Sequence, residues 1–245
     1  MRISKAWIVA AKDMRIFLRK KYLIYSLVAL PLIIGIGLPL VLHLVGAKKQ
    51  ALNGTALLSV MNAFSFFFGI GAGVLPIILA SYSLVGEKIE KSLEPLLATP
   101  ITDSELLLGK SIAAFIPPVC AIYISSIFFM GLSDLWTHNI LGYSYFPNWN
   151  IGLILLAVVP LAALLSIEWS VIVSSRATDV RAAQLQSMLV IIPFFIIYIL
   201  TEIGAITLDT RTIGIISGVI LVADIILFFL STKTFQREEI LTKWM

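Results

Sequence analysis

The sequence predicts an all-α polytopic membrane protein with six transmembrane helices, forming a single domain over residues 1–245. Three observations lead to this fold class. The chain is 59% hydrophobic and 13% charged, whereas soluble domains carry about 25% charged residues. Its mean hydropathy is +1.00. Several apolar runs reach the about 20 residues that a helix needs to cross the hydrocarbon core, and short charged segments separate them.

The first predicted element is an amphipathic helix over residues 2–20. Its apolar residues recur at helical spacing and form one stripe, made of Ile3, Trp7, Ala10, Met14, Phe17 and Leu18. Lys5, Lys12 and Arg19 lie opposite this stripe. A basic face opposite aromatic residues favours a helix that lies in the headgroup layer. The alternative is an extension that packs on the protein itself. The long charged region is not typical of a cleavable signal peptide.

Six apolar segments follow, and we expect each to cross the membrane as a helix. They cover approximately residues 22–45, 56–85, 106–132, 151–173, 187–203 and 213–230. Pro117-Pro118 is expected to kink the third helix, and Pro76 and Pro193 to bend the second and fifth.

The distribution of Lys and Arg predicts the orientation, because cytoplasmic loops carry an excess of both. With the N-terminus inside, seven of the 18 basic residues lie in residues 1–21, three in 86–110, two in the polar connection 174–187 and three in the tail 232–245. The outer loops hold only Lys48, Lys49 and Arg211, and the aromatic-rich loop 134–150 holds none. Both termini, and the tail with them, are therefore expected in the cytosol.

Residues 86–105 form a charged, amphipathic interruption between the second and third apolar segments. An apolar face (Ile89, Leu93, Leu96 and Leu97) opposes Glu87, Lys88, Glu90, Lys91 and Glu94. Pro95 is expected to divide the segment into two short pieces. Thr102-Asp103-Ser104-Glu105 is a capping-box sequence that predicts where the third helix begins. The segment either binds a partner or is a solvated loop without one.

The same segment resembles the first cytoplasmic loop of the type 2 family of ABC transporter permeases. The family pattern is a Glu, a Leu-Glu before a Leu-Leu pair, Thr-Pro, an acidic residue before leucines, and Gly-Lys. This chain has Glu87, Leu93-Glu94, Leu96-Leu97, Thr99-Pro100, Glu105 and Gly109-Lys110 in that order. The usual Gly-Thr pair is replaced by Lys91-Ser92. The six spans, the basic N-terminal helix and the tail sequence 237–241 are also similar to this family.

The resemblance implies a permease subunit of an ATP-driven transporter in the plasma membrane, and it favours an exporter. A separate ATPase subunit would bind ATP and Mg²⁺, and a second permease copy or a homologous partner would complete the path. The residues that would dock the ATPase are Glu87, Lys88, Leu93, Glu94, Leu96, Leu97, Thr99 and Pro100. Force from the ATPase would reach these residues first and the connection 174–187 second.

Two glycine motifs in the chain do not predict nucleotide binding. Gly109-Lys110-Ser111 lacks the upstream Gly of a phosphate-binding loop, since position 104 is Ser104. The glycines at 69, 71 and 73 lie within an apolar span. Gly69 and Gly73 instead have a small-xxx-small spacing, which permits close helix approach within the chain or between subunits. We therefore expect neither catalytic residues nor a cofactor in this chain.

Glu168 and Asp224 are acids within predicted spans, and they are the candidate pathway residues together with Gly69, Gly73, Pro76 and Pro193. Because a buried charge is costly in a membrane, each acid is expected to be protonated, hydrogen-bonded or exposed to a wet cavity. The favoured role for both is structural. The alternative function is a channel or a secondary transporter in which these acids couple ions. One cysteine and two histidines far apart give no basis for a metal site, and topology explains the basic residues better than nucleic acid binding does.

Overall fold

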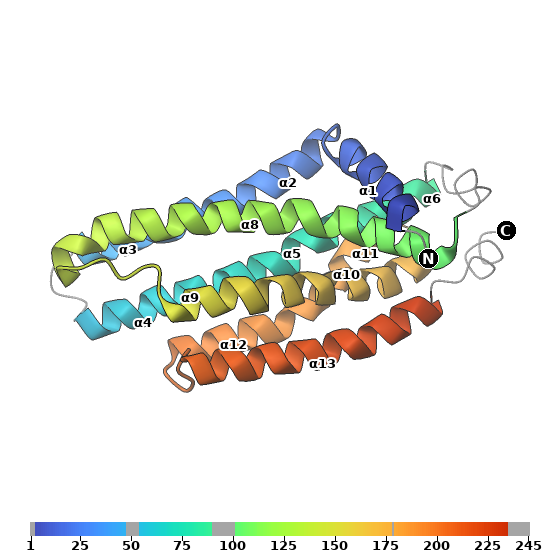
Figure 1. Ribbon diagram of the computed structural model, residues 1–245. Coiled ribbons are helices and arrows are strands. Elements are labelled where there is room, and N and C mark those ends of the chain that lie inside the picture. The colour runs from blue at the N-terminus through green and yellow to red at the C-terminus, as the bar shows by residue number, and fades with distance from the viewer. Residues whose placement is uncertain (1–2, 48–53, 90–100, 178, 235–245) are drawn as a thin grey trace.

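The computed structural model describes residues 3–47, 54–89, 101–177 and 179–234. All regular structure within these ranges is helical, and six spans are long and apolar enough to cross a membrane. Figure 1 shows these spans side by side in one bundle. The predicted fold class and the predicted number of spans are therefore confirmed.

The first and second spans change their winding along their length, whereas the third does not. The first combines α2 (Lys21–Leu32), the π-helical turn η1 (Ile33–Gly37) and α3 (Leu38–Ala47). The second combines α4 (Gly54–Ser65), α5 (Phe67–Ser81) and the π-helical turn η2 (Tyr82–Gly86), and α6 (Glu87–Ile89) continues it. The third is a single helix, α8 (Asp103–Leu141).

The last three spans are arranged as follows. The fourth contains α9 (Trp149–Leu153), the π-helical turn η3 (Ile154–Val158) and α10 (Val159–Arg176). The fifth contains α11 (Val180–Ser187), the 3₁₀ turn η4 (Met188–Ile191) and α12 (Ile192–Glu202). The sixth is α13 (Thr210–Thr234). In Figure 1, α6, α11 and the end of α13 lie at one end of the bundle, and the ends of α3, α8 and α12 lie at the other.

The third span is longer than predicted. With 39 residues, α8 extends about 58 Å at 1.5 Å per residue, well beyond the hydrocarbon core of about 30 Å. The prediction of a loop over residues 134–150 was wrong for its first half, since residues 134–141 belong to α8. Nothing between them breaks the helix, which ends at Gly142 with φ 77°. The helix also runs without interruption through Pro117 and Pro118.

The fifth span begins earlier than predicted. The polar connection 174–187 was predicted to separate the fourth span from a fifth span that begins at residue 187, but α10 extends to Arg176 and α11 begins at Val180. Arg and Gln are good helix formers, so polarity does not end the helix here. Asp179 caps α11, since its Oδ2 accepts a hydrogen bond from the backbone N–H of Ala182 at 3.2 Å.

The second span lies at the centre of the bundle, and its glycines allow close packing. A Cβ atom added at Gly69 would lie 2.9 Å from Cγ1 of Val158 in the fourth span. One added at Gly71 would lie 2.9 Å from side-chain atoms of both Ile34 and Ile122, in the first and third spans. Both distances are shorter than ordinary Cβ contacts, so a larger residue at either position would force the neighbouring side chains to shift.

Side chains of α8 donate hydrogen bonds to backbone carbonyl groups in two of the π-helical turns, η2 and η3, and just before the third, η1. Lys110 Nζ donates to the carbonyl of Ser83 in η2 at 2.9 Å. Tyr123 Oη donates to the carbonyl of Leu155 in η3 at 3.1 Å. Ser125 Oγ donates to the carbonyl of Pro31, just before η1, at 2.6 Å. Irregular backbone at membrane depth needs such partners, because lipid supplies none. The third span thus supports the irregular turns of its neighbours.

Candidate functional site

A buried ion cluster lies beside the start of the charged segment. At its centre is Lys110, whose side chain is 2% exposed. Its Nζ donates hydrogen bonds to Glu87 Oε2 at 2.5 Å, to Ser83 Oγ at 3.0 Å and to Asp13 Oδ2 at 3.3 Å. Ser83 Oγ in turn donates to Asp13 Oδ2 at 2.7 Å. Lys12 completes the cluster from its edge, with Nζ 2.6 Å from Glu87 Oε1.

The members of this cluster come from three separate parts of the chain. Lys12 and Asp13 belong to α1 (Ile3–Phe17), Ser83 and Glu87 to the end of the second span, and Lys110 to the first turns of the third. In Figure 1, α1 crosses the bundle beside the start of α8. The ion cluster therefore joins the N-terminal helix to both spans that flank the charged segment.

A glycine allows α1 to come close enough for these contacts. A Cβ atom added at Gly109 would lie 2.6 Å from the backbone oxygen of Ala6 and 2.8 Å from Cβ of Val9. Ala6 and Val9 are buried in this contact. Gly109-Lys110 thus acts as a packing and pairing unit: the glycine admits α1, and the lysine binds the carboxylate that α1 presents.

The two faces of α1 are used differently from the predicted stripe. Its buried face includes Asp13 together with apolar residues and packs on α8, whereas Trp7, Ile8 and Leu18 are exposed. One face of α1 therefore packs on the protein, as the alternative interpretation of this helix expected. The exposed apolar side chains of the other face suit the predicted contact with lipid headgroups.

The electrostatics of the cluster favour its charged form. Two lysines face two carboxylates, so its formal charge is balanced. Burial acts to lower the pKa of Lys12, but the hydrogen bond and charge of Glu87 and the charge of Asp13 outweigh it and raise that pKa above 10.5. Removing one partner of a buried pair costs about 3–5 kcal/mol, because the other charge is left uncompensated.

Of the eight predicted docking residues, two lie within the described ranges and six lie outside them. Glu87 begins α6 and points into the ion cluster, where it is 7% exposed. Lys88 lies in the same short helix. Leu93, Glu94, Leu96, Leu97, Thr99 and Pro100 fall outside the described residues. After the segment, the predicted capping box is present: Thr102 Oγ1 accepts from Glu105 N at 3.3 Å, and Glu105 Oε2 accepts from Thr102 N at 3.2 Å.

The connection between the fourth and fifth spans contacts the opposite side of the second span. Val85 in η2 is fully buried against Ala177 and Ala183. Gln184 Nε2 donates to the carbonyl of Ile78 at 3.4 Å. The end of the second span is therefore held on one side by the ion cluster and on the other by α11.

The predicted pathway residues occupy different environments. Gly69, Gly73 and Pro76 are buried inside the bundle, which identifies the glycine spacing with packing within the chain. Pro76 lies within the continuous helix α5, and the second span is interrupted on either side of it, at Phe66 and at η2. Pro193 is exposed and follows the 3₁₀ turn η4, where the winding of the fifth span changes.

Glu168 and Asp224 lie on two helices that pack against each other, α10 and α13. Asp224 is 6% exposed, and neither of its carboxyl oxygens has a hydrogen-bond partner among the described residues. Arg176, which lies two turns after Glu168 in the same helix, is exposed and forms no ion pair with it in the described part of the chain.

Sequence reasoning also missed the ion cluster. Lys12 was assigned to the outward basic face, and Lys110 was seen only as part of a motif. One signal was available: Asp13 is the single acid in the first twenty residues, and it falls at helical spacing from Val9, Ala10 and Phe17. An acid on an apolar face predicts a buried cationic partner. No group that could hold a metal ion occurs among the described His, Cys, Asp and Glu residues.

Comparison with known proteins identifies the family. The sequence matches the ABC-2 family transporter protein family over residues 7–240, which includes all six spans. No match to a curated protein was found for the chain. Members of the matched family are membrane permease components whose ATPase resides in a partner subunit. The chain therefore belongs to the ABC-2 family and is a multi-pass membrane permease subunit of an ABC transporter.

Proposed function

We propose that this permease is the membrane half of an exporter and docks its ATPase through the charged segment 86–100. The partner binds ATP and Mg²⁺, and a second permease copy or a homologous chain completes the path. Closure of the ATPase dimer would push on the segment, and the spans beside it would respond as a two-state element. Export, rather than import, follows from the family resemblance.

The observation that carries this proposal is the position of Glu87. This residue begins the segment and is bound by Lys110 and Lys12. A push on the segment would therefore act at once on the second span, on α1 and on α8. Because α8 continues without a break to Leu141, a displacement at Lys110 would be transmitted along a rigid helix to the opposite end of the bundle.

The connection 174–187 supports the secondary route. Its residues Ala177 and Ala183 contact Val85, two positions before Glu87 in the same span. A force on either connection would reach the same turn, η2. A π-helical turn is a common place for a helix to change its winding, so η2 is the element that we assign to the conformational step.

The replacement of Lys110 by Met tests whether the ion cluster couples ATP hydrolysis to the outer end of α8. The variants carry Cys120→Ser and a reporter cysteine, Ser144→Cys, which lies in the exposed loop after α8. In proteoliposomes with the ATPase, ATP should change the rate at which an impermeant thiol reagent labels the reporter. Lys110→Met should abolish this ATP dependence while the ATPase still copurifies, because the docking surface remains.

The matched control is Lys21→Met. It makes the same chemical change at an exposed position at the start of α2, outside the ion cluster. It should keep the ATP-dependent labelling. If Lys110→Met folds, binds the ATPase and labels as the parent protein does, the ion cluster has no part in coupling. If both variants lose the ATP-dependent change in labelling rate, the effect comes from the loss of a basic residue in general and not from the ion cluster.

An ion-coupled transporter remains the second candidate function, and the observation that favours it is the burial of Asp224, whose carboxyl oxygens have no hydrogen-bond partner among the described residues. Such a protein would transport without an ATPase. Transport by the permease alone, driven by an ion gradient and lost in Asp224→Asn, would support it against the exporter.

A further inference from the structure

The outward face of α1 and the turn after it combine exposed arginines with an exposed apolar side chain. Arg15 and Arg19 are exposed, and neither forms an ion pair within the described part of the chain. Leu18, between them, is 63% exposed. Asp13 is the single acid in residues 1–21, and it is buried in the ion cluster. The outward face therefore carries positive charge and no acid of its own.

An apolar pocket lies in the corner between α1 and α2, and its volume is about 130 Å³. The residues that line it come from the end of α1, the first two turns of α2, α5 and α8, and all of them are apolar. Leu18 lines the pocket and is also exposed, so it lies at the open side. Arg19 follows Leu18 directly, and Arg15 lies about one helical turn before it. The corner thus places two arginines beside an apolar pocket.

This corner lies at the membrane surface, because the first span begins at Lys21, two residues after Arg19. The direction of α1 agrees with this position. Its first half packs on Gly109 of α8, whereas its last residues line the pocket together with Pro117, eight residues further along α8. Eight residues correspond to about 12 Å of helix. The end of α1 that carries the arginines is therefore nearer to the membrane than its beginning.

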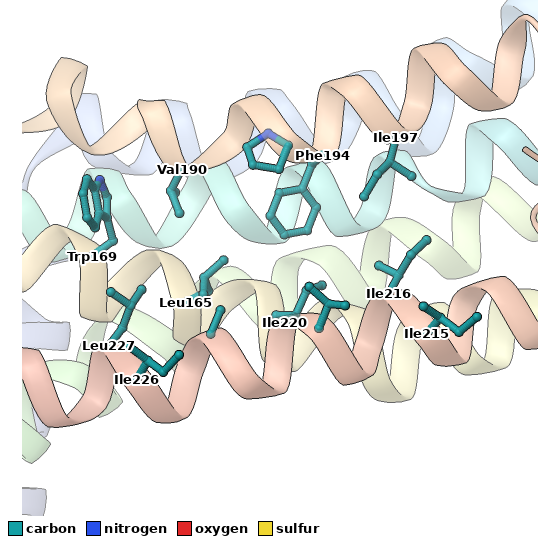
Figure 2. Close-up of a pocket in the computed structure, with 13 residues that line it drawn as sticks. Leu165, Trp169, Val190, Phe194, Ile197, Ile215, Ile216, Ile220, Ile226 and Leu227 are labelled. Atoms are coloured by element: carbon teal, nitrogen blue, oxygen red, sulfur yellow. The ribbon is translucent and has the colours of Figure 1, made fainter. Parts of the chain in front are cut away.

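A larger pocket between α10, α12 and α13 lacks this combination of charge and apolar lining. Its volume is about 480 Å³. Figure 2 shows apolar side chains such as Leu165, Phe194 and Ile220 around it. None of the described residues that line it is charged. An acyl chain could lie in this pocket, but nothing in the lining would select a headgroup, so the pocket provides the control for apolar contact alone.

We propose that the corner between α1 and α2 binds an anionic glycerophospholipid from the leaflet at this end of the bundle. Arg15 and Arg19 bind the phosphate of the headgroup, and one acyl chain enters the apolar pocket. Arginine suits this role, because its planar group donates two parallel hydrogen bonds to a phosphate. Basic residues next to a span also attract anionic lipids in general. The site is independent of the proposed function, since neither ATP nor an ATPase takes part in it.

Headgroup recognition is tested with the purified full-length permease in detergent micelles, where native mass spectrometry counts the bound lipids. Phosphatidylglycerol and phosphatidylcholine with the same acyl chains are compared. The parent protein should bind its first phosphatidylglycerol at least tenfold more tightly than phosphatidylcholine, and Arg15→Gln with Arg19→Gln should remove this preference. The matched control is Arg176→Gln with Arg181→Gln. It removes two exposed arginines at the same end of the bundle and should keep the preference.

The role of the pocket is tested by filling it. Ile24→Trp places a larger side chain in the pocket between α1 and α2 and should weaken phosphatidylglycerol binding at least fivefold. Ile226→Trp makes the same change in the larger pocket and should leave the affinity unchanged. The melting temperatures of both variants show whether they are folded. A second measurement needs no variant: glycerol 3-phosphate, which has the phosphate without the chains, should not displace the lipid from the parent protein.

Each other outcome would overturn a stated part of the proposal. Equal affinities of the parent protein for the two lipids would exclude an anionic site. A preference retained without Arg15 and Arg19 would place the lipid elsewhere, and a preference lost equally in the control without Arg176 and Arg181 would reduce the effect to net charge. Displacement by glycerol 3-phosphate would make a soluble phosphate the ligand. A permease that docks no ATPase would still bind the lipid, so failure of the exporter proposal leaves this test unaffected.

Discussion

Gly109 shows at the level of one residue how the site depends on backbone approach. A Cβ atom at this position would lie 2.6 Å from a backbone oxygen of α1, and backbone cannot yield as a flexible side chain does. The contact holds Asp13 within reach of Lys110. Glycine here is therefore a requirement of the ion cluster, although a helix interior normally disfavours it.

Gly109→Ala should therefore separate α1 from α8 and lower the thermal stability of the purified permease. The matched control is Gly131→Ala in the same helix, where nothing lies within 4 Å of the added Cβ. The control should be neutral or more stable by up to about 1 kcal/mol, because alanine is the better helix former. Equal melting temperatures for the two variants would show that α1 does not pack on α8 as described.

At the scale of elements, α8 is the helix on which its neighbours depend. Its side chains bond carbonyl groups at or next to η1, η2 and η3, so it stabilises the irregular turns of the first, second and fourth spans. These turns give the spans points at which the winding can change without exposing backbone to lipid. The π-helical turns thus lie in the first, second and fourth spans, and the side chains that stabilise them lie in the third.

Ser125→Ala should destabilise the first span against α8, because the carbonyl of Pro31 loses the hydroxyl that bonds it at 2.6 Å. Hydrogen bonds between membrane helices contribute about 0.6 kcal/mol on average and up to about 1.7 kcal/mol. Ser126→Ala is the control, since among the described residues the Ser126 hydroxyl bonds the carbonyl of Tyr123 in its own helix and none in another. Unfolding in denaturant measures both; an equal loss in the two variants would contradict the cross-helix role of Ser125.

The sequence could predict those elements whose signals are local. The six apolar segments, the capping box at Thr102 and the amphipathic N-terminal helix all follow from composition and spacing over one or two turns. The end of α8 was missed because polarity was read as a loop, although Gly142 is the first residue that stops the helix. Polar residues in a span outside the hydrocarbon core remain helical when nothing breaks the chain.

Pairs across the bundle could not be predicted in the same way. Asp13 and Lys110 are 97 positions apart. A periodic pattern shows which face of a helix is apolar, but it does not show which helix covers that face. The sequence could show that an acid lies on an apolar face. Identifying its partner required knowledge of how the helices are arranged.

At the scale of the whole molecule, α6, α11 and the end of α13 share one end of the bundle (Figure 1). The ion cluster belongs to this end, since Glu87 begins α6. The excess of Lys and Arg in the segments at this end predicts that it lies in the cytosol. The orientation stays a prediction, and it determines where a partner can dock.

Cysteine labelling in intact cells checks the orientation. In a Cys120→Ser background, Ser144→Cys should react with an impermeant thiol reagent, and Arg181→Cys in α11 should react only after the membrane is permeabilised. Both positions are exposed on the protein, so access depends on the side of the membrane alone. The reverse labelling pattern would place the charged segment outside and exclude an ATPase partner there.

The most direct test of the central claim is copurification of the ATPase with variants of the charged segment. Leu96→Ala with Leu97→Ala, and separately Glu94→Ala, should reduce recovery of the ATPase at least fivefold, while membrane insertion and thermal stability remain those of the parent permease. Lys21→Met should leave recovery unchanged. Because neither ATP binding nor hydrolysis is expected in this chain, the purified permease alone should show no ATPase activity. Full recovery of the ATPase by both segment variants would contradict docking through residues 86–100.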